Sequence, residues 1–471
     1  MISGVLRETP FERDWRLSTN CGPFDTVRLE TYNATYGCNF RPTALRFVST
    51  KEPDKEFAEP TPAWIEDALA VMVRAEGAGR QHGLYQAAQT ETVAVSDEIV
   101  YDLLARYEEQ IAFGERTESI LEDPKLPRPG DKIGAILSDP AIGHKKNRDE
   151  LTIAEVARGL DSARASGGPL VFLLPAFPFK DQNPFRSDLP ASSPDFGEIA
   201  MLIHLHCLAM AINQVFRHDV VWVIVSDGSV YEEMFDVPRG SAYQYLSALR
   251  DWRSRLNLGA SIHFIDLQDL VARHDAAFAT NPRRSFSKVN QEIAAILRSV
   301  ARKRDVSQST IMTNLNELAQ GMLWNRGWSQ AAQQYGLDTL WQVHCASCDT
   351  KLLASKFHRA AHDLWSQSLE TAIQYAAFNL ASKNTRLLSR FLPSAIRSTS
   401  HVKPGQVGIP RETGVAPWNG LAVYERRSAT SVRVRSVPLC QVPKTADIRF
   451  QLCSGSNGFG FAAREDVECY T

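Results

Sequence analysis

The sequence predicts an α/β protein whose core is a mostly parallel, doubly wound β-sheet. Three short apolar runs carry this prediction, at residues 170–174, 220–225 and 261–267. Each run has the length of a strand buried on both faces, and the segments between them, 199–215 and 243–256, have the composition of helices. Strands that alternate with helices of this length form parallel sheets with right-handed crossovers.

The chain of 471 residues is long enough for two or three domains. We predict a Rossmann-like core at residues 124–300, preceded by an N-terminal α+β extension at 1–123. A C-terminal α+β domain at 301–471 would cover one rim of the sheet. In the extension, residues 26–31 and 45–50 have a strand-like pattern, and no motif there assigns it a role.

Composition and charge exclude several classes of protein. Lys and Arg number 52 against 54 for Asp and Glu, so no basic field indicates a nucleic-acid partner. The first 20 residues lack the apolar region of a signal peptide, and no run is expected to reach membrane-spanning length. Eight cysteines without secretory targeting indicate reduced thiols. We therefore expect a cytoplasmic protein with no membrane partner, and a homodimer stays open.

Polar groups follow the first two predicted strands directly. Pro175 and Pro178 force the chain out of the sheet and deliver Lys180 to the carboxyl end of the first strand, where open α/β sheets bind ligands. Ser-Asp-Gly follows the second strand and places Asp227 at the same rim. Alone, Lys180 is a solvated lysine and Asp227 a turn residue, but two strand ends at one rim favour a site. No Gly-rich phosphate loop supports a nicotinamide or flavin cofactor.

The loop after Lys180 continues with Asn183 and Arg186 and closes with Asp195 and Glu198 at the start of a helix. Either Ser193 or Asp195 is a suitable cap for this helix, and the helix dipole favours Glu198 in the first turn. Each residue therefore has a structural explanation, and the combination is more specific than its parts. It comprises Pro-Ala-Phe-Pro-Phe-Lys at 175–180, Asn183, Pro-Asp-Phe-Gly-Glu at 194–198 and Ser-Asp-Gly at 226–228. This combination resembles the isonitrile synthases of the pyoverdine/dityrosine biosynthesis family.

The resemblance extends to the C-terminal third of the chain. Arg397 to His401 is similar to the family's Arg-x-Ser-Ile-His-Pro strand, and Pro417-Trp418-Asn419 is similar to its Pro-Trp-His motif. The departure that matters is Asn419 in place of histidine, because an amide does not titrate near neutral pH.

The resemblance implies an enzyme of natural-product biosynthesis. It would convert the α-amine of an amino acid of the L-tyrosine or L-tryptophan type to an isonitrile, with ribulose 5-phosphate as carbon donor and no bound cofactor or metal. The catalytic residues it implies are Lys180, Asp195, Glu198, Asp227 and His401. The substrate-binding residues it implies are Phe177, Asn183, Arg186, Arg397, Trp418 and Asn419. Lys180 would form an iminium with the ketose or anchor its phosphate, and His401 is the best general acid or base.

Two other functions stay open. An N-formyl amino acid synthase would stop at a different product, and Asn419 keeps open a catalytically altered protein that binds an amino acid or a sugar phosphate. A separate pattern is Cys345 and Cys348, spaced C-x-x-C, before His358 and His362 on an expected helix. These four residues indicate either a structural zinc site or buried cysteines and surface histidines.

Overall fold

The computed structural model describes most of the chain from residue 91 onward. The described residues are 91–181, 187, 189–235, 237–303, 315, 318–319, 350–400, 404–409, 415–428, 431–439, 442–443, 445–454 and 458–471. The strands predicted at 26–31 and 45–50 lie outside this set.

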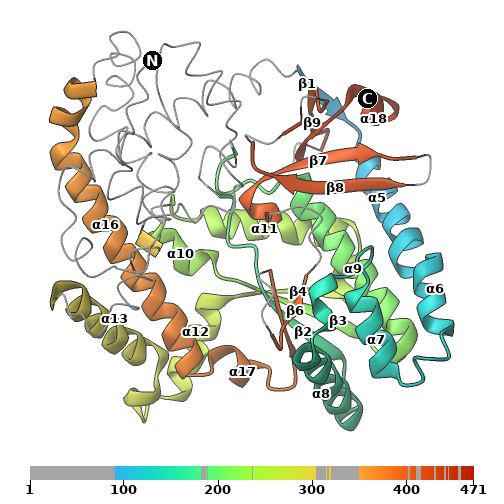
Figure 1. Cartoon of the computed structure of the whole chain (residues 1–471), viewed down its shortest axis with the longest axis horizontal. Coiled ribbons are helices and arrows are strands. Elements are labelled where there is room, and N and C mark those ends of the chain that lie inside the picture. Colours follow the sequence, from blue (N-terminus) through green and yellow to red (C-terminus); the bar gives the residue numbers. More distant parts are fainter. Residues whose placement is uncertain are drawn as a thin grey trace, which may run out of the picture.

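The first sheet is parallel throughout, with the strand order β4-β3-β2-β5-β6 (Figure 1). Its strands are β2 (Leu170–Pro175), β3 (Val220–Ser226), β4 (Ile262–Asp266), β5 (Ile396–Thr399) and β6 (Val407–Gly408). The three predicted apolar strands are confirmed as β2, β3 and β4. Strands β5 and β6, which come from the segment predicted as the C-terminal domain, complete the sheet.

The strand order contains one reversal. The chain enters the sheet at β2, moves outward through β3 to β4, and then returns to the other side of β2 with β5. The reversal therefore lies between β2 and β5, and open α/β sheets bind ligands beyond the carboxyl ends of the strands at this point. Lys180 follows β2 and therefore lies at this end of the sheet.

Helices cover both faces of the parallel sheet. On β3, Trp222 and Ile224 point into a core shared with helices α8 (Glu150–Ser166), α9 (Phe196–Phe216) and α11 (Ser241–Arg255). Val221, Val223 and Val225 point into a second core. The helices of this core are α10 (Gly228–Met234), α12 (Leu267–Ala277), α13 (Phe286–Lys303), α16 (Thr350–Asn384) and α17 (Leu387–Phe391). Alternate side chains of one strand thus meet helices on opposite faces, and the predicted doubly wound α/β fold is confirmed.

The two helical segments expected between the strands, 199–215 and 243–256, correspond to α9 and α11. The α-helices are α5 (Glu98–Tyr107), α6 (Glu115–Glu122), α7 (Pro129–Ser138), α8 (Glu150–Ser166), α9 (Phe196–Phe216), α10 (Gly228–Met234), α11 (Ser241–Arg255), α12 (Leu267–Ala277), α13 (Phe286–Lys303), α16 (Thr350–Asn384), α17 (Leu387–Phe391) and α18 (Arg464–Val467). Shorter turns are η3 (Glu108–Ala112, a π-helix), η4 (Lys145–Arg148), η5 (Leu258–Ala260), η6 (Pro282–Arg284), η8 (Pro417–Asn419) and η10 (Glu468–Tyr470).

A second sheet of mixed direction lies on the far side of α9. Its strands are β1 (Glu91–Val95), β9 (Ile448–Leu452), β10 (Phe459–Ala462), β7 (Leu421–Arg426) and β8 (Val432–Val437), in that spatial order. β7 pairs with β8 and β9 with β10 in antiparallel fashion, whereas β10 pairs with β7 and β1 with β9 in parallel. Figure 1 shows α9 between the parallel sheet and the hairpin of β7 and β8, and α9 contacts strands of both sheets.

Helix α9 is the central element of the fold. By length and composition it is apolar enough to cross a membrane, so the expectation that no segment reaches this length is wrong. Within the described residues it is the one such helix, and 61% of its apolar window is buried inside the protein. Its hydrophobicity follows from its contacts with two sheets, because a helix that is covered on most sides needs few polar residues.

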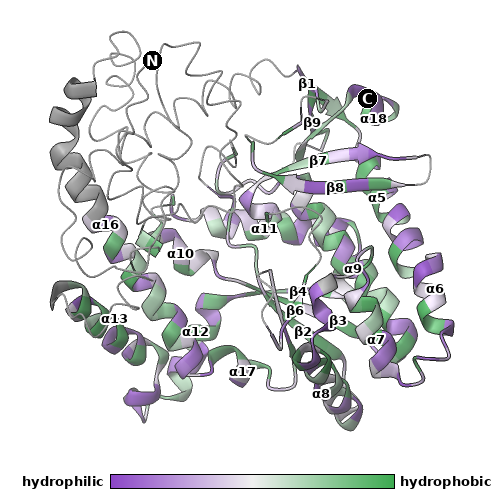
Figure 2. Cartoon of the chain, in the orientation of Figure 1, coloured by the Kyte–Doolittle hydropathy of each residue, from purple (hydrophilic) through white to green (hydrophobic). Residues whose placement is uncertain are grey.

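The outer helices have one apolar side. α13 shows separate hydrophobic and hydrophilic sides in Figure 2, and its buried residues Ala294, Leu297 and Val300 face α16. This pair of helices covers the α12 side of the parallel sheet (Figure 1).

Candidate active site

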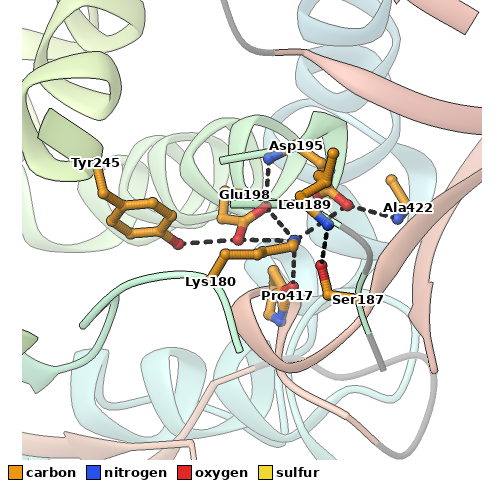
Figure 3. Close-up of polar contacts among 9 residues, drawn as sticks. Lys180, Ser187, Leu189, Asp195, Glu198, Tyr245, Pro417 and Ala422 are labelled. Carbon is orange, nitrogen blue, oxygen red and sulfur yellow. Dashed lines mark hydrogen bonds and ion pairs between the residues drawn. The ribbon is translucent and has the colours of Figure 1, made fainter. Parts of the chain in front are cut away.

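A buried ion cluster lies where the chain leaves β2. The Lys180 Nζ is 3.0 Å from both Glu198 Oε1 and Oε2, 3.0 Å from Asp195 Oδ2, and 2.9 Å from the Pro417 carbonyl oxygen (Figure 3). Lys180, Asp195 and Glu198 are each 0% exposed. Three of the residues predicted as catalytic therefore meet in one cluster that solvent does not reach.

The start of α9 supplies both carboxylates of the cluster. Asp195 Oδ1 accepts a hydrogen bond from the Gly197 N–H at 2.8 Å, and Glu198 Oε2 accepts one from the Asp195 N–H at 2.8 Å. This reciprocal pair is a capping box, which satisfies N–H groups that a helix start leaves free. Asp195 Oδ2 also accepts from the Ala422 N–H of β7 at 2.9 Å. The predicted capping role of Asp195 is confirmed, and the same carboxylate joins α9 to the second sheet.

The other residues of the Pro-Asp-Phe-Gly-Glu motif have tight surroundings as well. A Cβ atom at Gly197 would lie 2.8 Å from Ser436 Oγ on β8, so a larger residue would push α9 away from the second sheet. Phe196 is buried and makes edge contacts with Tyr424 and Phe450 of that sheet. The motif thus forms the contact between α9 and the C-terminal strands.

Electrostatics keep Lys180 protonated. Burial alone would lower the pKa of Lys180, but the charges of Asp195 and Glu198 outweigh it and raise that pKa above its ordinary value. Burial, followed by the neighbouring Asp195 carboxylate, raises the pKa of Glu198 well above its ordinary range. Glu198 Oε1 also accepts a hydrogen bond from the Tyr245 hydroxyl at 2.9 Å, and burial raises the pKa of that hydroxyl. At neutral pH Lys180 is thus an ammonium ion.

The segment before Lys180 has an unusual backbone. Phe177 has φ 58°, in the left-handed region that non-glycine residues rarely adopt, and strain of this kind is common at functional sites. The Ser226 hydroxyl donates to the Phe177 carbonyl oxygen at 2.9 Å. The centroids of the Phe177 and Trp418 rings are 4.9 Å apart. Phe177 is 0% and Trp418 is 7% exposed. The two aromatic residues predicted to bind substrate therefore pack against each other inside the core.

Asp227 occupies the carboxyl end of β3, beside this segment. A Cβ atom at Gly228 would lie 1.8 Å from the Pro178 carbonyl oxygen, so the loops after β2 and β3 are in direct contact and only glycine fits there. Asp227 keeps some solvent exposure as a residue, whereas its Oδ1 atom is buried and has no hydrogen-bond partner in the described part of the chain. The two loops predicted to share a rim therefore do so.

The surroundings of Asp227 favour its neutral form. Burial, with a smaller contribution from the charge of Asp266, raises the pKa of Asp227 to about 7, and a hydrogen bond from Tyr231 opposes the shift. Tyr231 lies one helical turn after Asp227, and its N–H donates to the Asp227 carbonyl oxygen at 3.2 Å. Because this carboxyl titrates near neutral pH, it can both accept and return a proton under physiological conditions.

Aromatic rings stand next to Asp227. The ring of Tyr231 lies 5.4 Å from that of Tyr375 and 5.7 Å from that of Phe235, measured between centroids. Burial raises the pKa of Tyr231 and of Tyr375. Tyr231 and Tyr375 were not among the predicted site residues. Tyr231 could have been found from its position four residues after Asp227 on the following helix, but Tyr375 lies on α16, far along the chain.

The remaining predicted residues have different positions. Arg397 is half-buried on β5, where burial lowers its pKa and the charge of Glu155 opposes this. Asn419 is half-buried, and its N–H donates to the Ala416 carbonyl oxygen at 2.8 Å within the η8 turn. Asn183, Arg186 and His401 lie outside the described residues, as do Cys345, Cys348 and the side chains of His358 and His362. In the part of the chain that is described, no three His, Cys, Asp or Glu residues form a potential metal site.

These features define a class: an α/β protein with a parallel sheet of reversed strand order and ionisable residues at the carboxyl ends of its strands. The family model of the pyoverdine/dityrosine biosynthesis proteins matches residues 160–340 of the chain. That segment contains β2, β3 and β4, together with the motifs at 175–180, 194–198 and 226–228. The resemblance to the isonitrile synthases of this family is therefore confirmed.

Individual relatives agree with the family match. Isocyanide synthase xanB of Aspergillus fumigatus is 40% identical over 102 residues, which are 21% of this chain and 13% of that protein. Isocyanide synthase A of the same fungus is 34% identical over 141 residues, 28% of this chain and 23% of that protein. The chain thus matches less than a quarter of the length of these two relatives. The L-tyrosine isonitrile synthase of Pseudomonas aeruginosa is 23% identical over 265 residues, 55% of this chain and 70% of that protein.

Among solved structures, the crystal structure of the PvcA protein from Pseudomonas aeruginosa is similar, with a TM-score of 0.46 and 20% identity. The superposed region covers 66% of this chain and 92% of that one.

Proposed function

We propose that the protein is an isonitrile synthase that converts the α-amine of an amino acid to an isonitrile, with ribulose 5-phosphate as the carbon donor and without a bound cofactor. The observation that carries the proposal is Asp227, a carboxyl with a pKa of about 7 and a buried oxygen that lacks a described hydrogen-bond partner. It lies at the ligand-binding rim of a chain whose motifs match isonitrile synthases.

The first step of this chemistry needs a group that gains and loses a proton near neutral pH, as Asp227 does. Joining an amine to the ketone of a sugar phosphate forms a C–N bond and expels water, so a base must take a proton from the ammonium group and an acid must protonate the departing hydroxyl. A carboxyl that titrates near pH 7 performs both transfers in turn. We assign both transfers to Asp227, and His401 remains the candidate for the later proton transfers.

The surroundings of Asp227 also indicate a class of amine. The partly exposed rings of Phe235 and Tyr375 stand on the Tyr231 side of this carboxyl. Aromatic rings favour both an ammonium group and another aromatic side chain. We therefore propose an amino acid of the L-tyrosine or L-tryptophan type as the amine substrate.

A phosphorylated ketose needs a fixed cation for its phosphate. Arg397 lies on β5, next to the reversal of strand order, and is half-buried. We propose Arg397 for this role, together with Arg186 from the loop after β2.

The proposal is tested by incubating the protein with ribulose 5-phosphate labelled with ¹³C at C2 and a panel of amino acids, and analysing products by mass spectrometry. We expect a labelled isonitrile from an aromatic amino acid, and a rate of formation about 100-fold lower with Asp227→Asn. A labelled product heavier by one water would identify an N-formyl amino acid synthase instead. Unchanged substrates, together with thermal stabilisation by one of them, would overturn the proposal in favour of a binding protein.

A further inference from the structure

We propose that Lys180 is a positioning residue of this site: its ammonium group fixes the rim segment to the C-terminal layer and does not bond to substrate. The catalytic part of this inference rests on the proposed function. The structural part rests on the geometry of the ion cluster alone. It differs from the roles that the family resemblance suggested for Lys180, which were an iminium with the ketose or an anchor for its phosphate.

The hydrogen-bonding capacity of Lys180 is fully used inside the protein. An ammonium group has three N–H donors and no acceptor. Here three acceptor groups surround Nζ at 2.9–3.0 Å: the Glu198 carboxylate, the Asp195 carboxylate and the Pro417 carbonyl. Because Lys180 is also 0% exposed, a substrate phosphate has no direction from which to approach Nζ without displacing one of these groups.

The surroundings of Lys180 also disfavour an iminium with the ketose. A lysine attacks a ketone only as the neutral amine, with a lone pair directed at the carbonyl carbon. Two carboxylates in contact with Nζ stabilise the protonated form, in contrast to the apolar or cationic surroundings that activate nucleophilic lysines.

The cluster joins segments that are far apart in the sequence (Figure 3). Lys180 belongs to the rim segment after β2, Asp195 and Glu198 to the start of α9, and Pro417 to the turn before β7. Two backbone hydrogen bonds hold the same segment. The Lys180 N–H donates to the Ala191 carbonyl oxygen at 3.0 Å, and the Asp181 N–H donates to the Trp418 carbonyl oxygen at 2.8 Å. The segment that carries Phe177 and touches the Asp227 loop is therefore held in place through Lys180.

Removing the ammonium group alone would leave two buried carboxylates facing each other. Breaking a buried ion pair on one side is much more damaging than replacing the whole pair, because it leaves an uncompensated buried charge. This asymmetry supplies the test. Lys180→Met removes the ammonium, and the double variant Lys180→Met, Glu198→Gln also removes one of the two negative charges. In the double variant the introduced amide oxygen remains an acceptor for the Asp195 N–H, and the amide NH2 group takes the position that faces the Tyr245 hydroxyl, which can accept from it.

The experiment compares the natural protein, both variants and Lys383→Met, which replaces an exposed lysine on α16. Turnover is measured by isonitrile formation, and folding by the midpoint of thermal unfolding. We expect Lys180→Met to turn over about 100-fold more slowly than the natural protein and to unfold at a lower temperature. The double variant should turn over about tenfold faster than Lys180→Met, and its unfolding midpoint should lie between those of Lys180→Met and the natural protein. Lys383→Met should match the natural protein.

A second measurement examines covalent chemistry directly. The natural protein is incubated with ribulose 5-phosphate, treated with sodium borohydride, and digested for peptide mapping. We expect no reduced sugar adduct on Lys180. An adduct there, or a folded double variant no more active than Lys180→Met, would overturn the inference. If the natural protein forms no product with any amine, the proposed function fails, and recovery of the unfolding midpoint in the double variant still decides the structural part of the inference.

Discussion

Replacing Asp227 by Asn should stabilise the protein at alkaline pH and at the same time reduce its activity. The pKa of Asp227 rises from 3.8 in the unfolded chain to about 7 in the folded protein. Between these values the folded protein keeps a proton that the unfolded chain releases. The stability contributed by this group is therefore complete below pH 3.8 and is lost as the pH rises through about 7.

The magnitude follows from the size of the shift. One pKa unit corresponds to about 1.4 kcal/mol, so the full shift corresponds to roughly 4 kcal/mol. Because Asp227 keeps some solvent exposure, screening reduces this value. The Asn amide has a similar shape, keeps an acceptor for Tyr231 and never ionises. We expect Asp227→Asn to raise the free energy of unfolding by about 1 kcal/mol at pH 5 and by about 2 to 3 kcal/mol at pH 8.

Urea unfolding of both proteins at the two pH values measures this difference. Asp269→Asn, which neutralises an exposed carboxylate on α12, serves as the control and should change stability little at either pH. Turnover of Asp227→Asn should fall by about 100-fold at both pH values, since an amide transfers no proton. The reasoning is refuted if Asp227→Asn destabilises the protein at pH 8, or if its effect on stability is the same at pH 5.

Other substitutions examine the remaining parts of the site. Tyr245→Phe removes the donor to Glu198 Oε1 and should lower the free energy of unfolding by about 1 to 2 kcal/mol in urea, and unchanged stability would contradict the cluster geometry. Gly228→Ala places a methyl group against the Pro178 carbonyl oxygen, so product formation should fall at least tenfold in a protein that still folds, and natural activity would show that the loop contact does not matter. Asn419→His restores the family's histidine and should change product distribution or amine preference more than KM for ribulose 5-phosphate. Identical products and preferences would leave Asn419 only its role in the turn.

Local pattern was sufficient for the centre of the parallel sheet. β2 and β3 are buried on both faces, so each is an almost unbroken apolar run that is visible in the sequence. β4 lies at the edge of the sheet with His263 exposed, and its apolar residues Ile262, Phe264 and Ile265 still mark it as a strand. Strands β5 and β6 contain polar residues such as Arg397 and pair with partners more than 200 residues away in the sequence, or with each other. No local signal fixes such pairing. The position of the reversal in strand order, which locates the rim, therefore required the structure.

The candidate site was predictable in its residues and less so in their surroundings. The motif spacing correctly placed Lys180 and Asp227 on neighbouring loops, because parallel strands carry their carboxyl ends to one edge. Burial was not predictable, since it depends on Pro417 and Ala422, which reach the cluster from the C-terminal part of the chain. The neighbour Tyr375 was not predictable for the same reason.

The burial of Lys180, Asp195 and Glu198 changes how the family motifs are interpreted. Apolar packing alone tolerates small shifts of one segment against another, whereas an ammonium group bonded to two carboxylates and a carbonyl requires one arrangement. A rim formed by loops from distant parts of the chain needs such a constraint, because the loops lack regular structure of their own. Asp227 has different surroundings, because the residue is partly exposed and its buried Oδ1 atom has no hydrogen-bond partner among the described residues. Of the residues that the motifs identify, Asp227 is thus the one we expect at the reacting atoms, and the Lys180 cluster is the frame that keeps its loop in place.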